Sequence, residues 1–418
     1  MKNILGAAFL LIVVALANQV AAASGPIKLG LNYPSTGRFS SDGIAEAQGA
    51  MLAVEEINQN GGMEGRPIEL ITANTASQPE KAIDNVRQMA KQGVSMVFGG
   101  VTSTVTIAAG KEAAQHGLLY FGTLSYANQT TGEEAHRYMF RECHNSWMMA
   151  KSLAGYLLEH HSKDRIGYIT ADYSWGWSTE SSLRGLSGTA DKVVHPSFLL
   201  PFPKPRHQQM AETLDAVLQS GVDTLVITLG GQNLVAMLRM IKNNPATENL
   251  TLIATAFTLG MARNAGPYLL DGVIGTVPWS WNIPYELGYE KGQRFVEAYV
   301  QKYDQYPSSP AASAYNIVYQ YKDAVERAGT LDTDSVIKAL EGHRYTALKD
   351  EQVWRAFDHQ NVQSVYLVKG RPRNEVIQDK YRENFFQVLQ SFRGDELVRS
   401  YDEWKAVRTK AGKPTYLE

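Results

Sequence analysis

Short apolar runs alternate with longer stretches of helical periodicity along the first third of the chain. The runs read as strands, and the stretches with apolar residues three and four positions apart read as helices. The predicted strands lie at residues 27–31, 67–72, 94–98 and 118–121. The predicted helices lie at residues 45–58, 80–92 and 104–116. This alternation predicts right-handed βαβ units and a mainly parallel sheet covered by helices on both faces.

The same pattern restarts after about residue 145. Strands are predicted at 165–170, 223–229 and 251–255, and strand character returns within 353–370. Helices are predicted at 146–159, 178–186, 209–219, 234–243, 289–304 and 311–328. The segments GVSMVFGG (93–100) and GVDTLVITLGG (221–231) also echo each other, since each has a helix stop, a strand and a double-glycine loop. The sequence therefore predicts two similar α/β lobes.

Length, charge and cysteine content narrow the class of protein. At 418 residues the chain exceeds one ordinary domain of roughly 100–200 residues, which again favours two lobes. Lys and Arg number 40 against 42 Asp and Glu, so the chain lacks the basic field on which nucleic-acid binding relies, and we expect no nucleic-acid partner. A single cysteine, Cys143, excludes an intramolecular disulfide and a thiolate-rich metal site.

The first residues are typical of a targeting segment. Lys2 supplies a positive start, residues 4–17 form an almost unbroken apolar run, and Ala21 and Ala23 supply small side chains for cleavage. The run is shorter than a membrane-spanning helix requires. We therefore expect residues 1–23 to be a cleaved signal peptide and the mature chain to reside in the periplasm.

Loops that follow predicted strands are candidate binding segments, because ligands of open parallel sheets bind beyond the carboxyl ends of the strands. Residues 99–104 combine glycines with hydroxyls at a helix start, which suits a carboxylate or similar anion. Thr102 or Ser103 as a simple helix N-cap explains the same pattern. Trp175, Trp177, Trp279 and Trp281 follow strands of the second lobe, either as ligand walls or as core.

Motifs for catalysis are missing from the sequence. It contains no HExxH, GxSxG, GxxxxGK[ST] or GxGxxG pattern, so we expect no enzymatic activity, metal or cofactor. Asp358 and His359 form a conceivable orienter–base pair, with a structural hydrogen bond as the alternative.

The sequence IKLGLNYPSTGRFSSDG, followed by AVEEINQNGGMEGRPIEL, GVSMVFGGVTSTVTIAAGKEAAQHGLLYFGTLSY and DRIGYITADYSWGWS, resembles type I periplasmic substrate-binding proteins of ABC importers, in their leucine/isoleucine/valine-binding branch. The resemblance spans about residues 27–370. It implies two Rossmann-like lobes with mainly parallel sheets, joined by three hinge crossovers near residues 142–145, 276–279 and 354–357. The implied lobes are 24–144 plus 278–355 and 145–277 plus 356–372, and residues 373–418 are expected to form a helical extension.

The resemblance also implies which residues bind the ligand. Ser103, beside Thr102, matches a hydroxyl that holds a ligand carboxylate, and Trp175 matches an aromatic lid. The other matched positions are Leu124, Ser125, Tyr126, Gly230 and Thr255. Trp279 adds a further aromatic candidate.

One departure from the family pattern concerns the ligand's amine. Amino-acid binders of this family carry a glutamate near Thr255, and this chain has no acid between Leu252 and Leu270. Asp42 or Asp172 is a possible replacement, and an aromatic or aliphatic carboxylate or an amide is an equally suitable ligand.

The resemblance implies a monomeric receptor that delivers an amino acid or related small organic acid or amide to the membrane permease subunits of an ABC importer. A soluble ligand-binding partner of a chemosensory receptor is the alternative. A repressor would begin with a helix-turn-helix, and an exported hydrolase would need a nucleophile with its base.

Overall fold

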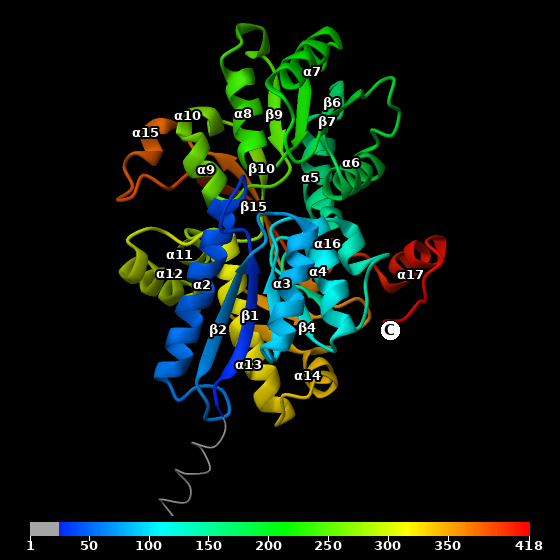
Figure 1. Cartoon of the computed structure of the whole chain (residues 1–418). Helices are drawn as coiled ribbons and strands as arrows, with labels where there is room; N and C mark the ends of the chain where they lie inside the picture. The colour runs from blue at the N-terminus through cyan, green and yellow to red at the C-terminus, as the bar shows by residue number, and fades with distance from the viewer. Residues whose placement is uncertain (1–24) are drawn as a thin grey trace, which may run out of the picture.

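The computed structural model describes residues 25–418, and the predicted signal peptide lies outside this range. The chain forms two α/β lobes stacked end to end, the first at the bottom and the second at the top of Figure 1. The sheet of the first lobe is fully parallel, with strand order β2-β1-β3-β4-β5. Its strands are β1 (Ile27–Tyr33), β2 (Ile68–Asn74), β3 (Met96–Gly99), β4 (Leu119–Gly122) and β5 (Met139–Arg141).

Helices cover both faces of the first sheet, because its strands are apolar on both sides. Met96 and Phe98 of β3 pack with α2 and α13, whereas Val97 packs with α3 and α4. At the contact between α2 and α13, a Cβ on Gly49 would lie 2.0 Å from the carbonyl oxygen of Ala311, so only glycine permits this approach. The helices are α2 (Ser40–Gln59), α3 (Pro79–Lys91), α4 (Ser103–Gln115), α11 (Ile283–Leu287), α12 (Glu290–Tyr303), α13 (Ser309–Ala328) and α14 (Thr333–Leu340).

The second lobe has a mixed sheet with strand order β15-β14-β10-β9-β8-β6-β7, in which β14 and β15 are antiparallel to their neighbours. Its strands are β6 (Ile166–Asp172), β7 (Ser197–Pro201), β8 (Thr224–Thr228), β9 (Thr251–Ala254), β10 (Ile274–Val277), β14 (Val365–Gly370) and β15 (Phe386–Phe392). Its helices include α5 (Ser146–His160), α6 (Ser174–Ser187), α7 (His207–Gln219), α8 (Gly231–Lys242), α9 (Leu259–Ala265) and α10 (Pro267–Leu270). Helices α5 and α6 cover one face, and α7 to α9 cover the other.

The start of α6 differs from the sequence prediction. We expected a helix at 178–186 after a long aromatic loop, but α6 begins at Ser174, directly after β6. Trp175 and Trp177 therefore lie in the first turn of a helix and point in different directions. Trp175 is buried, whereas Trp177 is half exposed.

The chain crosses between the lobes after β5, after β10 and after β13. The first two crossings lie at residues 142–145 and 278–279, whereas the third lies at residues 363–364 and not at 354–357. Residues 356–362 stay with the first lobe because β13 (Asn361–Val362) pairs with β12 (Glu351–Trp354), which itself pairs with β11 (Arg344–Thr346). His359 also stacks on Phe140, with 3.8 Å between ring centroids. The predicted lobe boundary at residue 355 is therefore too early.

The expected helical extension at 373–418 is wrong in its first half. After α15 (Arg373–Val376), β15 extends the second sheet as an edge strand paired with β14. The chain then passes α16 (Gly394–Leu397) and returns to the first lobe through α17 (Tyr401–Lys410), shown in red in Figure 1. There Trp404 is buried, and its Nε1 donates to the carbonyl of Thr131 over 2.8 Å.

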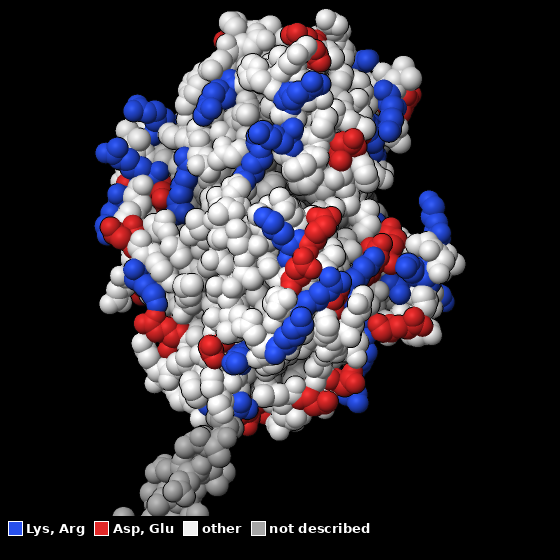
Figure 2. Space-filling view, viewed as in Figure 1, with Lys and Arg blue, Asp and Glu red and all other residues white. Residues whose placement is uncertain are grey.

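Charges of both signs are interspersed over the face shown in Figure 2. Across residues 25–418, none of the helices combines the length and apolar character needed to cross a bilayer.

Candidate ligand-binding site

The carboxyl ends of the parallel strands of the two sheets face each other across a cavity between the lobes. The cavity holds about 420 Å³ of space between its lining atoms, including space that is open to solvent. Loops after β1, β3 and β4 supply the first-lobe wall, and loops after β6, β8 and β9 supply the second. The lining residues are Phe39, Asp42, Val101, Ser103, Leu124, Tyr126, Tyr173, Trp175, Gly230, Gly231, Ala256, Thr258 and Met261.

Five helices begin at this cavity, namely α2, α4, α6, α8 and α9. The N-cap residues of the first four are Phe39, Thr102, Tyr173 and Gly230, and none of these makes a side-chain capping bond. Only Thr258, at the start of α9, caps its own helix, by accepting a hydrogen bond from the N–H of Met261 over 3.2 Å. Uncapped helix N-termini attract negative charge, so their convergence makes the cavity suited to a carboxylate.

Ser103 begins α4 and lies on the cavity wall. Its Oγ accepts a hydrogen bond from the backbone N–H of Ala127 over 3.0 Å, which leaves the hydroxyl proton free to donate to a ligand. Because the bond fixes the oxygen, Ser103 is oriented in advance.

Aromatic rings form the second-lobe side of the cavity and meet Tyr126 of the first lobe. The ring centroid of Trp175 lies 6.1 Å from that of Tyr126 and 6.1 Å from that of Tyr173. The Tyr126 hydroxyl and the Trp175 Nε1 are buried and have no hydrogen-bond partner in the described part of the chain. Burial raises the pKa of Tyr126 well above its ordinary value, so the hydroxyl stays protonated and able to donate.

Asp42, in the first turn of α2, is the one charged side chain among the described residues that line the cavity. It is 3% exposed, and its Oδ1 has no hydrogen-bond partner among residues 25–418. Burial raises the pKa of Asp42 to about 6, and a hydrogen bond with Thr258 opposes this rise. One turn further along α2, burial raises the pKa of Glu46 to about 8, and the Thr123 hydroxyl donates to its Oε1.

Six of the ten residues singled out from the sequence line this cavity. They are Asp42, Ser103, Leu124, Tyr126, Trp175 and Gly230. The other four lie outside it. Thr102 is buried beside Ser103, and the Ser125 Oγ pairs with the Thr130 Oγ1 at 2.6 Å. Thr255 is buried within the second lobe, and the Trp279 Nε1 donates to the carbonyl of Leu348 over 3.3 Å. Asp172, the alternative acid to Asp42, is exposed.

Sequence reasoning overlooked several wall residues. Tyr173 and Thr258 are helix N-caps and Gly231 is the first residue of α8, and each follows a strand closely, so their positions in the sequence could have identified them. Phe39 and Met261 look like ordinary core residues in the sequence, and only the approach of the two lobes brings them to the cavity. Gly231 adopts a φ of +54°, and a Cβ there would lie 3.0 Å from the Phe39 ring, so glycine permits the lobes to meet.

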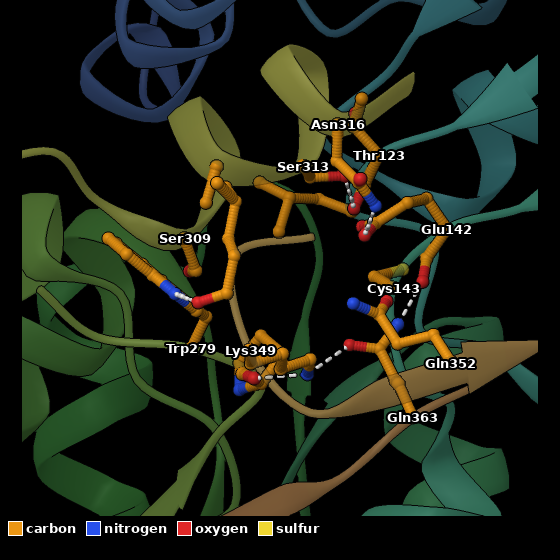
Figure 3. A pocket seen from close by; sticks show the side chains of 14 residues that line it. Thr123, Glu142, Cys143, Trp279, Ser309, Ser313, Asn316, Lys349, Gln352 and Gln363 are labelled. Atoms are coloured by element: carbon orange, nitrogen blue, oxygen red, sulfur yellow. Dashed lines mark hydrogen bonds between the residues drawn. The ribbon is translucent and has the colours of Figure 1, made fainter. Parts of the chain in front are cut away.

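A second, smaller cavity lies at the hinge, and its walls include Thr123 and Leu124 from behind the first site (Figure 3). Lys349 lines this cavity and is buried. The Lys349 Nζ donates to the carbonyl of Pro278 over 2.7 Å, to the Gln363 Oε1 over 2.6 Å and to the carbonyl of Ser364 over 2.9 Å. Burial lowers the pKa of Lys349 to about 8.

The same network reaches the first crossover. The Gln363 Nε2 donates to the carbonyl of Glu142, and the Asn316 Nδ2 donates to the Glu142 Oε1 over 3.0 Å. Cys143 lies beside it, and burial raises the pKa of its thiol to about 12. All three crossovers are thus tied together by buried hydrogen bonds.

The pair Asp358–His359 has structural partners. Asp358 accepts hydrogen bonds from the guanidinium of Arg355, and the His359 Nε2 lies 3.0 Å from the Glu341 Oε1. Within residues 25–418, no three His, Cys, Asp or Glu side chains are grouped so as to hold a metal ion.

Comparison with known proteins places this geometry in a family. The model of the periplasmic binding protein family matches residues 26–375. The chain is 27% identical over 311 residues to Leu/Ile/Val-binding protein homolog 8 of Brucella abortus (strain 2308), covering 71% of this chain and 75% of that protein.

Two solved structures share the fold. One is a periplasmic binding protein from Burkholderia mallei, with a TM-score of 0.80 and 20% identity over 90% of this chain and 97% of that one. The other is a solute-binding protein of an ABC transporter from Rhodopseudomonas palustris BisB5 in complex with 3,4-dihydroxybenzoic acid, with a TM-score of 0.74 and 17% identity, covering 88% of this chain and 98% of that one.

The family match covers most of the chain, and the two lobes with a cavity between them agree with it. The chain belongs to the periplasmic binding protein family, whose members bind solutes and are not enzymes.

Proposed function

We propose that this chain is an exported monomeric receptor that binds an amino acid or a related small carboxylate or amide and delivers it to the permease of an ABC importer. The observation that carries the proposal is the cavity between the lobes, where uncapped helix N-termini converge with the unpartnered donors of Tyr126 and Trp175. Buried polar groups are normally hydrogen-bonded, so unpartnered donors that surround a cavity favour a ligand as their partner. The predicted signal peptide supports a periplasmic location.

Closure of the lobes follows from contacts that the ligand makes with both of them. The Arg38 Nη1 of the first lobe donates to the Asn233 Oδ1 of the second over 2.8 Å, and Phe39 lies against Gly231. These contacts join the two lobes beside the cavity. A ligand that touches Ser103 on one side and Trp175 on the other adds to them and shifts the population towards closure. The permease then meets the surfaces of both lobes in one fixed arrangement.

A thermal-shift screen of the purified mature protein tests the proposal. The panel contains amino acids, aliphatic and aromatic carboxylates, amides and polyols. A true ligand at 100 times its dissociation constant stabilises the protein by about 2.7 kcal/mol. We expect the shift to disappear in the Ser103→Ala/Trp175→Ala double variant and to persist in Trp177→Ala, whose side chain is half exposed outside the cavity. Unchanged affinity in the double variant would remove this site assignment.

A further inference from the structure

The ligand cavity has an acid in its wall and no base. Within the described residues, Asp42 is the one charged side chain of the lining, and no Lys, Arg or His lines the cavity. The Asp42 Oδ1 is buried without a hydrogen-bond partner in the same part of the chain. A buried carboxylate oxygen without a hydrogen-bond donor is costly, so a ligand group that donates to it gains correspondingly.

Neighbouring acids cannot replace Asp42 in this role. Glu46 lies one turn behind it on α2 outside the lining, and its Oε1 accepts from Thr123 while its Oε2 has no partner among the described residues. Burial raises the pKa of Glu46 to about 8, so this side chain is protonated and uncharged at neutral pH. Asp172 is exposed and accepts from the Trp177 Nε1 over 2.9 Å. The ligand therefore meets one carboxylate, and that carboxylate comes from the first lobe.

The two charges of an amino acid match two separate parts of this cavity. Its carboxylate suits the N-termini of the helices, above all that of α4, where Ser103 is fixed with its proton free. A ligand with a carboxylate alone brings a second negative charge beside Asp42 with no cation to balance it. A protonated amine removes this conflict, because it supplies donors to Asp42 and restores neutrality.

We propose that Asp42 receives the protonated amine of the ligand, so that the physiological ligand is a zwitterionic amino acid and not a plain carboxylate. The inference rests on the proposed function and adds the chemical class of the ligand to it. It replaces the second-lobe glutamate of the resemblance with an acid from the opposite lobe. Asp42 also faces Thr258 of the second lobe, so the amine is held where the two lobes meet.

Matched ligand pairs test the inference. Each pair is an amino acid and its analogue without the amine, for example leucine with 4-methylpentanoate and phenylalanine with 3-phenylpropanoate. We expect at least one amino acid to bind the wild-type protein and its analogue to bind about 10- to 100-fold more weakly, the range for hydrogen bonds to charged groups. The Asp42→Asn variant is expected to bind the amino acid more weakly by a similar factor. The Asp172→Asn variant is expected to bind it with the wild-type affinity.

The outcomes separate this inference from the proposed function. Equal binding of an amino acid and its analogue, or full amino-acid affinity in Asp42→Asn, overturns the role of Asp42 while leaving a receptor in place. If only plain carboxylates bind, the role of Asp42 is likewise overturned and the receptor function stands. A panel in which no compound binds overturns both proposals.

The pH dependence of amino-acid affinity is a second, independent test of the role of Asp42. The titratable groups facing Asp42 are Glu46 on its own helix and Tyr126 from the loop after β4, and α9 presents Thr258 and the backbone of Gly260. Because the pKa of Asp42 is about 6 without a ligand, amino-acid affinity should fall up to tenfold for each pH unit below that value. Affinity that rises on acidification would indicate a plain carboxylate ligand and overturn the inference.

Discussion

The ligand cavity and the hinge cavity lie back to back, and each buries a charged side chain. At the hinge, the Lys349 Nζ has three acceptors between 2.6 and 2.9 Å. In the ligand cavity, the Asp42 Oδ1 has no partner among the described residues. The two buried charges therefore have different roles. A charge whose hydrogen bonds are all made within the protein holds segments in place, whereas a carboxylate oxygen without a donor at a cavity wall is a binding partner for a ligand.

Removal of the hinge ammonium tests the first half of this comparison and has the largest expected effect. In Lys349→Met the carbonyls of Pro278 and Ser364 and the Gln363 Oε1 lose their donor while remaining buried. We expect the free energy of unfolding to fall by about 3–5 kcal/mol, as measured by urea denaturation of the ligand-free protein.

Lys369→Met on β14 is the matched control, because Lys369 is exposed and should change stability by less than about 0.5 kcal/mol. If Lys349→Met were as stable as this control, the hinge network would not hold the crossovers together.

Asp42→Asn tests the second half, in the ligand-free protein. Burial raises the pKa of Asp42 from 3.8 to about 6, so the folded state binds more protons than the unfolded state between these pH values. Stability from this group is therefore highest in acid and falls as the pH rises towards 6, by up to about 3 kcal/mol. Asparagine carries no such cost, so the variant should be more stable than the wild type at pH 7–8, by a margin that shrinks towards pH 4. Denaturation at several pH values measures it.

A stability gain that does not depend on pH would show that Asp42 carries no unpaired charge in the ligand-free cavity. Asp172→Asn serves as the exposed control and should follow the wild-type profile.

Arg38→Ala has the smallest expected effect and concerns closure itself. Its bond to Asn233 joins the lobes beside the ligand cavity without lining it. We expect affinity for the identified ligand to fall about two- to tenfold, because one partly buried hydrogen bond contributes about 0.5–1.5 kcal/mol to the closed form. Calorimetry gives the affinity, and small-angle scattering gives the closed fraction. An unchanged affinity would mean that this bond does not stabilise closure.

Most of the fold could be predicted from the sequence because its strands and helices are marked by local patterns of apolar residues. Apolar runs and helical periodicity marked β1 to β4 and most of the helices. The errors concern elements fixed by distant contacts. Strand β15 is exposed along most of its length and becomes a strand only by pairing with β14. The third crossover lies later in the chain than expected because His359 stacks on Phe140, a residue more than 200 positions earlier.

The site was accessible in part, for a related reason. Ser103 reaches the cavity as the pattern of helix starts after parallel strands predicts, whereas Gly230 was expected from the family resemblance. Trp279 lies in the hinge cavity and not in the ligand cavity, because its strand ends at the hinge. The absence of a partner for the Asp42 Oδ1 could not be predicted, because it depends on which side chains the second lobe places against Asp42.

The burial of Cys143 has a practical consequence for observing this molecule. It is the only cysteine of the chain, it lies in the hinge at 1% exposure, and its thiol pKa is raised to about 12. Maleimide dyes react with thiolates, so the native residue should stay unlabelled in the folded protein. One cysteine introduced on the surface of each lobe then carries a donor and an acceptor fluorophore, and opening and closing can be followed in single molecules without first deleting a native thiol.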